Sequence, residues 1–184
     1  PRTGVPVYRA EDRHVMLDGN RVERLFLQGT VNLQMNPPRG WVVSREGRGR
    51  YSIRFEHVSS PSMRFGFALI GKEGFIPDRE KKSFLRYALG LHLREPKNWE
   101  VTVLTDFDKP PPRKGISFLG QRPITVEYKY VHQETGKAVH RREYFIEKDR
   151  LWLVFVFEAP DAFYGRNIRN FESILAYIDY PDET

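Results

Sequence analysis

The chain has 184 residues, close to the usual size of one domain, and 40% of them are hydrophobic, which is enough for a packed core. Its 30 basic and 24 acidic residues give a formal net charge of +6. Because the two signs are interspersed, this balance favours a solvated surface over a nucleic-acid footprint. The lack of cysteine excludes disulfides, thiolate metal sites and thiol nucleophiles.

Residues 1–20 are rich in charge and show no apolar periodicity. This pattern predicts an N-terminal tether or flexible arm at 1–20, followed by a single domain at 21–184. The sequence starts at Pro1 without Met, which is compatible with an upstream signal or lipid-anchoring segment. Zero cysteine fits a bacterial envelope protein, although many cytosolic proteins also lack cysteine. We therefore expect contact with a membrane only through a segment that precedes Pro1.

Between Arg21 and Leu69 the sequence has the pattern of short strands separated by turns. Apolar and polar side chains alternate in Tyr51–His57 and in Met63–Leu69, which is typical of strands with one buried face. Shorter candidate strands are Val22–Leu27, Val31–Met35 and Trp41–Val43. We expect the side chain of Trp41, and that of Trp152 further along the chain, to be buried in the core.

A helix is predicted from Asp78 to Glu95. Asp78 is a suitable N-cap, apolar residues recur on one helical stripe, and Pro96 ends the segment. Trp99–Phe107 is the next predicted strand.

The loop after this strand carries three consecutive prolines and three cations. Prolines cannot join a ladder and favour an extended conformation, so the loop is predicted to be stiff and exposed. An extended segment loses little entropy on docking, and the cations suit an acidic groove. The alternative is that the prolines only stiffen a long connection. The candidate partner-binding residues are Lys109, Pro110, Pro111, Pro112, Arg113 and Lys114.

The last third of the chain predicts an antiparallel meander followed by a helix. Three strands, Ile124–Tyr130, Val139–Glu147 and Leu151–Phe157, are joined by short turns. The seven apolar residues of Leu151–Phe157 are too few to span a bilayer, which needs about 20, and they suit a strand buried on both faces. From Asp161 the spacing is helical, and this helix would cover one face of the sheet. The apolar face of the helix consists of Ile168, Phe171, Leu175 and Ile178.

The sequence contains no constellation that indicates catalysis, a metal or a cofactor. Asp106 and Asp108 could ligate a hard cation, but two carboxylates without further oxygen ligands make a weak site. No nucleophile elbow and no phosphate-cradling glycine loop occur. The histidines lack partners at metal-ligand spacing, and His57 is expected to be a partly buried strand residue. These histidines are His14, His57, His92, His132 and His140.

Two basic clusters leave two interpretations open. If they converge in space, they would form a patch for an anionic partner. In the other interpretation they form a solvated, salt-bridged surface, because Arg141 and Arg142 are consecutive and must point to opposite faces of their strand. The clusters are Arg45, Arg48, Arg50 and Arg54, and then His140, Arg141 and Arg142, with Arg113 and Lys114 in the proline loop.

Short motifs resemble the PsbP/Mog-like superfamily, named for a photosystem extrinsic subunit and a Ran-binding nuclear import factor. Pro38–Trp41 looks like the early P-x-G-W element of that family. The expected helix Asp78–Glu95, the strand Leu151–Phe157 and the segment Asn170–Leu175 are similar to its first helix, last strand and C-terminal helix. Together with the order of elements, the resemblance implies an α+β fold with a central antiparallel sheet flanked by helices on both faces.

Members of this superfamily are mostly non-catalytic and dock on larger assemblies, and many bacterial relatives are exported or lipid-anchored. The resemblance therefore implies a non-catalytic accessory protein of the bacterial periplasm or outer surface that docks on a protein assembly. The basic balance and the proline-rich loop depart from the photosynthetic branch, so manganese, calcium or chloride binding is not implied. No motif implies Ran binding.

Two other classes stay open. One is a soluble, cytoplasmic binding module for an anionic ligand or, less expected, nucleic acid. The other is an enzyme whose site is assembled from scattered residues.

Overall fold

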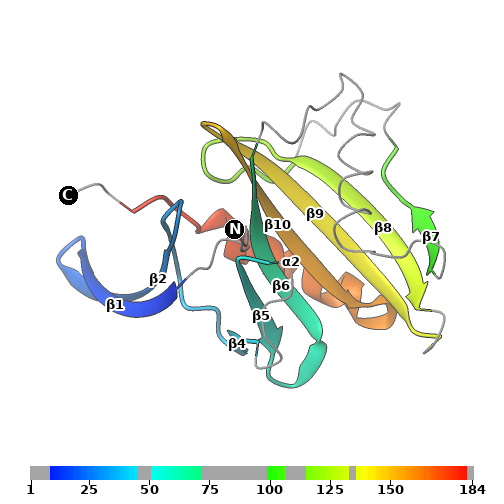
Figure 1. The fold of residues 1–184 in the computed structure, drawn as a ribbon. Helices are drawn as coiled ribbons and strands as arrows, with labels where there is room; N and C mark the ends of the chain where they lie inside the picture. The colour runs from blue at the N-terminus through cyan, green and yellow to red at the C-terminus, as the bar shows by residue number, and fades with distance from the viewer. Residues whose placement is uncertain (1–8, 45–50, 72–98, 107–114, 133–135, 182–184) are drawn as a thin grey trace, which may run out of the picture.

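Two antiparallel sheets and one helix form the part of the chain that the structure, a computed structural model, describes (Figure 1). The described residues are 9–44, 51–71, 99–106, 115–132 and 136–181. The small sheet has the order β1-β2-β3 and the large sheet the order β4-β5-β6-β10-β9-β8-β7. The strands are β1 Arg9–Leu17, β2 Asn20–Gln28, β3 Leu33–Met35, β4 Trp41–Val43, β5 Ile53–His57, β6 Ser60–Gly71, β7 Trp99–Val103, β8 Ile124–His132, β9 Ala138–Lys148 and β10 Leu151–Pro160, and the helix is α2 Asp161–Ala176.

Strand β10 lies at the centre of the large sheet, between β6 and β9. Its residues from Trp152 to Ala159 are all buried, which confirms the prediction of a strand covered on both faces. The antiparallel meander β8-β9-β10 is also confirmed. Trp152 is 7% exposed, as expected for a core residue.

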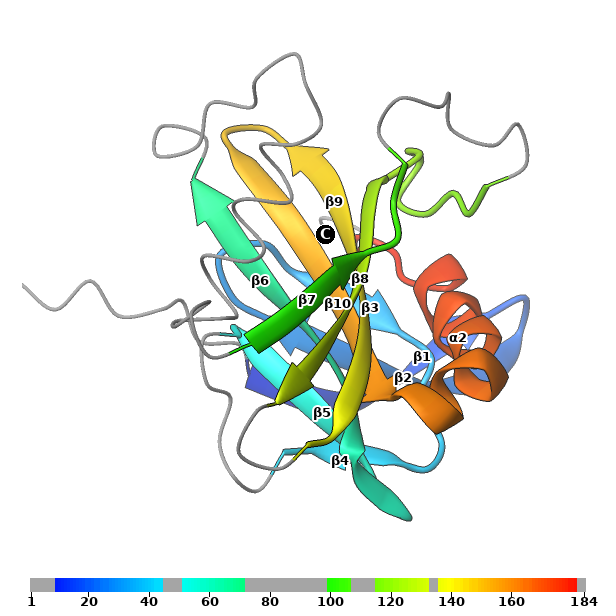
Figure 2. The same cartoon turned by 90° about the vertical axis from the view of Figure 1, so that its right-hand side faces the viewer.

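Helix α2 covers one face of the large sheet (Figure 2). Tyr164, Phe171 and Leu175 are buried in the core between the helix and the sheets. The α+β class and the sheet at its centre are confirmed. The expected helix Asp78–Glu95 lies outside the described residues, so cover by helices is shown for one face only.

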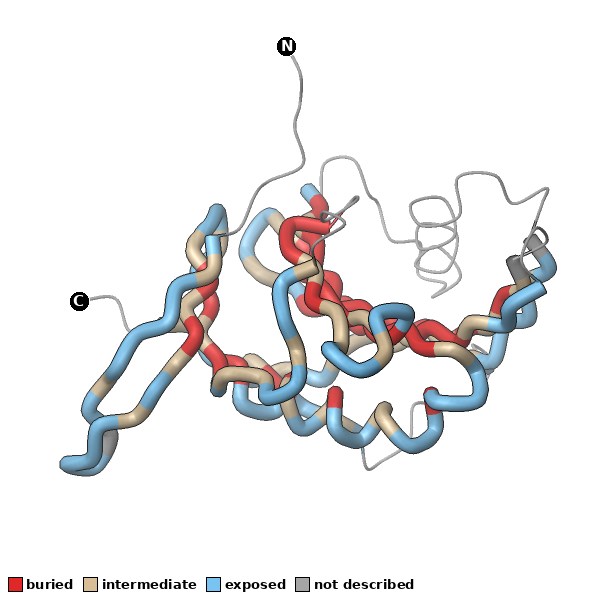
Figure 3. The backbone as a smooth tube through the Cα atoms, turned by 90° about the horizontal axis from the view of Figure 1, so that it is seen from below, coloured by how far each residue is buried: buried red, intermediate tan, exposed pale blue. Residues whose placement is uncertain are grey.

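The core divides into two clusters, one on each face of the large sheet. The larger cluster joins α2, the small sheet and residues such as Phe155 and Phe157, whose rings pack against other aromatic rings. The other cluster includes Tyr128, Val154 and Trp152. Figure 3 shows that buried residues concentrate along the strands of the large sheet. The described part of the chain has no helix long and apolar enough to cross a bilayer.

The expectation of a flexible arm is wrong for residues 9–17. They form β1, which pairs with β2 from Arg9↔Gln28 to Leu17↔Asn20, so the expected boundary after Asn20 falls inside a hairpin. The turn uses positive φ at Asp18 and Gly19. Because β1 is an outer strand with mostly exposed side chains, it needs no apolar alternation, and its backbone ladder holds it in place. The hairpin extends to one side of the large sheet (Figure 1).

Candidate functional site

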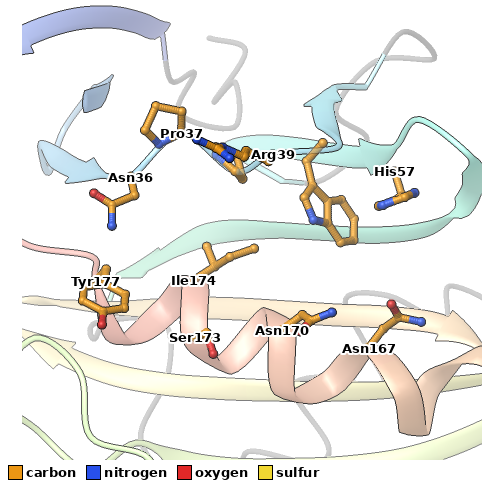
Figure 4. Close-up of a pocket in the computed structure, with 11 residues that line it drawn as sticks. Asn36, Pro37, Arg39, His57, Asn167, Asn170, Ser173, Ile174 and Tyr177 are labelled. Atoms are coloured by element: carbon orange, nitrogen blue, oxygen red, sulfur yellow. The ribbon is translucent and has the colours of Figure 1, made fainter. Parts of the chain in front are cut away.

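A groove of about 340 Å³ lies between the outer side of helix α2 and the connection from β3 to β4 (Figure 4). Its two walls come from segments that are more than a hundred residues apart in sequence. The wall on the strand side consists of Asn36, Pro37, Pro38, Arg39, Trp41 and His57, and the helix wall of Asn167, Asn170, Ser173, Ile174 and Tyr177.

The helix wall follows from the way α2 packs on the sheet. Phe171 and Leu175 point into the core, and residues three or four apart lie on the same side of a helix. The polar row Asn167, Asn170 and Ser173 therefore forms a neighbouring face of the helix, which lines the groove. Figure 4 shows these side chains in a line along the helix.

The strand wall is a tight turn held by backbone hydrogen bonds. The amide of Trp41 donates to the carbonyl of Pro38 over 3.1 Å, and the amide of Val58 donates to the carbonyl of Gly40 over 2.9 Å. Gly40 has φ +83°, and an added Cβ would lie only 3.1 Å from His57 Nε2. A side chain at position 40 would therefore be strained and crowded.

The two walls are joined at one end of the groove. Gln34 in β3 and Asp179 after α2 exchange two backbone hydrogen bonds of 2.8 and 2.9 Å. Arg24 of β2 donates to Asn36 Oδ1 and lies 3.5 Å from the carboxylate of Asp179. These contacts fix the distance between the helix and the β3–β4 connection, so the groove is preformed.

Trp41 forms an aromatic surface within the groove. It begins an edge strand and is only partly buried, so the expectation of a buried ring is wrong, although the ring packs against the core. Edge-to-face contacts hold the ring against Phe65 at 4.8 Å and His57 at 5.0 Å between centroids. Trp41 and Asn170 line the groove from its two opposite walls.

His57 is a partly buried strand residue, as expected. The backbone amide of Ser59 donates to His57 Nδ1 over 3.2 Å. An acceptor nitrogen carries no proton, so in the neutral ring the proton is on Nε2, beside Gly40. Within the groove His57 is therefore a hydrogen-bond donor through Nε2.

A second polar cluster joins the start of α2 to strands β8 and β9. The ring of His140 stacks on Tyr164 with centroids 3.4 Å apart, and its Nε2 lies 2.6 Å from Glu127 Oε1. Burial acts to raise the pKa of Glu127, but the hydrogen bond from His140 and the charge of Arg142 outweigh it and hold that pKa below its ordinary value. Arg142 also donates to Glu172 of α2 over 2.8 Å. This cluster anchors the helix on the sheet.

Arg141 points to the opposite face from Arg142, as their consecutive positions require. Its Nε donates to Glu158 over 2.9 Å, and its Nη1 to the hydroxyl of Tyr128 over 3.2 Å. The salt-bridged interpretation is thus confirmed for both arginines. Arg141 is buried rather than solvated, at 6% exposure, so it is no part of a surface patch.

Several expected residues lie outside the described part of the chain. These are the candidate partner-binding residues Lys109–Lys114, the carboxylate Asp108, and Arg45, Arg48 and Arg50 of the first basic cluster. The proline loop therefore stays a prediction from the sequence. Among the described residues, no three His, Asp or Glu side chains gather as metal ligands would.

The groove was missed in the sequence because its two walls come from separate segments, and no single motif spans both. The apolar face of α2 was identified, but the row Asn167, Asn170 and Ser173 beside it was not. Short amide and hydroxyl side chains at that spacing are unusual for a solvated helix, where Lys, Glu and Gln are the stronger helix formers. The occurrence of Asn and Ser at these exposed helix positions, in place of stronger helix formers, was the signal in the sequence that could have indicated the groove.

Neither a protein-family model nor a curated protein sequence matches the chain. A solved structure does: cyanobacterial PsbP (CyanoP) from Synechocystis sp. PCC 6803, with a TM-score of 0.54 and 11% identity over 81% of this chain and 86% of that chain. The chain has the PsbP/Mog-like fold. This confirms the resemblance that was drawn from Pro38–Trp41 and the closing strand and helix.

Two further structures are similar at lower TM-scores. The Ran-binding protein Mog1p of Saccharomyces cerevisiae has a TM-score of 0.48 and 10% identity, over 95% of this chain and 97% of that chain. Protein PA94 of Pseudomonas aeruginosa has a TM-score of 0.42 and 14% identity, over 94% of this chain and 99% of that chain. The PsbP/Mog-like fold does not by itself assign a partner or a ligand.

Proposed function

We propose that the chain is a non-catalytic accessory protein that docks on a partner protein through the groove beside α2. The observation that carries this proposal is the preformed groove, with an aromatic ring on one wall and a row of amides on the other. A partly exposed Trp in a fixed orientation is a common anchor for protein partners, because it supplies contact area with little loss of side-chain entropy.

The shape of the groove favours a protein segment over an enclosed small molecule. Small-molecule sites surround most of their ligand. Here Asn36 and Arg39 on one wall and Asn170, Ser173 and Tyr177 on the other are exposed to solvent. The groove is therefore open along its length, which suits a chain that lies across the surface.

The proposed location is the periplasm or outer surface of a bacterial cell, with attachment through a segment upstream of Pro1. The cysteine-free composition and the exported or lipid-anchored relatives that the superfamily implies support this location. Fractionation of cells that express the full-length protein tests it. Recovery in the soluble cytoplasmic fraction would contradict the envelope proposal without affecting the docking proposal.

Filling the groove is expected to abolish docking while the fold is kept. A photo-crosslinking side chain at Ser173 identifies the partner in cells, and binding of that purified partner is then measured. We expect Asn170→Phe to lower the affinity at least about tenfold, because the exposed ring occupies the space between α2 and Trp41.

Ala176→Phe is the matched control, since Ala176 is exposed on the same helix and does not line the groove. This variant should bind as the parent does. Equal affinity of the parent and Asn170→Phe for the crosslinked partner would show that the groove is not the docking site.

A further inference from the structure

Arg39, at the edge of the groove, is a cation without a partner among the described residues. It is exposed, and no hydrogen bond or ion pair joins its guanidinium to any described residue. Arg24, at the joined end of the groove, is by contrast occupied by Asn36 and Asp179. The residues that line the groove include no Asp or Glu. The groove is therefore electrically positive and offers a free guanidinium.

The amides of the groove have hydrogen-bonding capacity left for a ligand. Asn36 uses Oδ1 for Arg24, which leaves its Nδ2 as a donor. Asn167 uses Nδ2 for the carbonyl of Phe163 over 2.7 Å, which leaves its Oδ1 as an acceptor. Asn170 points into the groove and engages no described residue with its side chain. This mixture of donors and acceptors matches the alternating N–H and C=O groups of an extended backbone.

The length of the groove sets the size of the segment. From Asn167 to Tyr177 the helix wall rises about 15 Å, at ~1.5 Å per residue. An extended chain covers about 3.3 Å per residue, so four to five residues fit along the wall.

From these observations we infer that the docked segment is an extended stretch of about five residues with an Asp or Glu side chain that pairs with the Arg39 guanidinium. This inference rests on the proposed docking function. Asn167 and Asn170 bind the backbone of the segment, Trp41 supports a neighbouring side chain, and Arg39 selects the carboxylate. Arg is suited to this role because its planar fork matches a carboxylate in two places.

A library of random octapeptides, displayed on phage with a protein fused after the peptide, tests the inference. The fusion removes the free C-terminal carboxylate, so any acidic preference comes from side chains. Selection on the parent protein is expected to enrich Asp and Glu, and selection on Arg39→Glu is not. A blocked synthetic copy of the best peptide and its Glu→Gln version are then measured by fluorescence anisotropy.

We expect Arg39→Glu to lower the affinity for the acidic peptide about tenfold, because an attractive charge pair becomes a repulsive one. The Glu→Gln peptide should bind the parent protein up to about fivefold more weakly than the acidic peptide does. The peptide's affinity should also fall as salt rises, since an exposed charge pair is screened. Arg21→Glu is the matched control. It makes the same change of charge on the β1–β2 hairpin, outside the groove, and should leave the affinity unchanged.

The outcomes separate this inference from the proposed function. Enrichment of neutral or basic peptides whose binding is lost in Asn170→Phe would overturn the acidic preference and keep the docking function. Binders that are insensitive to Asn170→Phe, or no binders, would count against both. A single-stranded DNA oligonucleotide serves as the competing anionic probe. If it binds in an Arg39-dependent way and the peptides do not, the groove takes phosphate groups and the peptide inference fails.

Discussion

Replacing Glu158 with Gln is expected to lower the free energy of unfolding by roughly 3–5 kcal/mol, the usual loss when a buried ion pair keeps only one partner. Glu158 is 8% exposed and accepts hydrogen bonds from Nε and Nη2 of Arg141 and from the hydroxyl of Tyr130. Gln keeps the shape of the side chain and one carbonyl oxygen. The variant therefore removes the negative charge while most of the packing stays.

The loss follows because Arg141 cannot shed its charge. Burial acts to lower the pKa of Arg141, but Glu158 and the neighbouring tyrosines outweigh this and hold that pKa above its ordinary value. Tyr128 cannot replace the anion, since burial raises the pKa of its hydroxyl and keeps it neutral. The Glu158→Gln protein thus contains a buried guanidinium that has lost the charge of the carboxylate to which it donates hydrogen bonds.

Urea unfolding of three variants measures this effect. A double variant, Arg141→Met with Glu158→Leu, replaces both charges by apolar groups and should recover most of the loss, as such replacements are often neutral. Glu11→Gln is the control for an exposed pair. Its partner Arg13 lies 2.9 Å away, and the two side chains are 42% and 43% exposed. The free energy of unfolding of this variant should stay within about 0.5 kcal/mol of that of the parent. If Glu158→Gln costs less than about 1 kcal/mol, the pair is hydrated in solution.

The contrast between β10 and β1 shows which elements the sequence could predict. Strand β10 is apolar on both faces, so its place at the centre of a sheet can be read from its residues alone. Strand β1 has charged side chains and little burial, and its structure comes from backbone pairing with β2, which leaves no periodic signal. Patterns of hydrophobicity therefore locate elements that form the core and miss an outer strand.

The groove could not be predicted for a different reason. The Gln34–Asp179 bridge holds the end of β3 beside the end of α2, and this brings Asn36 and Asn170 to the two walls of one groove. That bridge is a backbone contact between two segments with no shared motif. Trp41 illustrates the same limit, because its turn was identified correctly and its position at the edge of the large sheet was not.

The second large effect is expected at Phe171. Its ring stacks on Phe157 with centroids 5.0 Å apart and also contacts Phe65 and Tyr144, so it joins α2 to three strands of the large sheet. Phe171 is 1% exposed. Its replacement by Ala should lower the free energy of unfolding by about 3–5 kcal/mol, because the change removes buried apolar area and leaves a cavity.

Phe163→Ala is the matched control on the same helix. Phe163 is 46% exposed, and its contact with the groove residue Asn167 uses its backbone carbonyl, which Ala retains. We expect the free energy of unfolding of this variant to lie within about 0.5 kcal/mol of that of the parent. If Phe171→Ala lowers the free energy of unfolding as little as Phe163→Ala does, α2 is held by its polar anchors and not by the aromatic core. One such anchor is the contact between Arg142 and Glu172.

The same pair of variants connects the core to the groove. Phe171 lies next to Asn170 in sequence and sets the depth at which α2 sits on the sheet, so a cavity beneath it allows the helix wall to shift relative to Trp41. Phe171→Ala should therefore weaken binding of a groove ligand even under conditions in which the variant is fully folded, and Phe163→Ala should not. Measured by anisotropy at a temperature well below both melting midpoints, unchanged affinity in folded Phe171→Ala would show that the Gln34–Asp179 bridge and the β3–β4 turn hold the groove without help from the core.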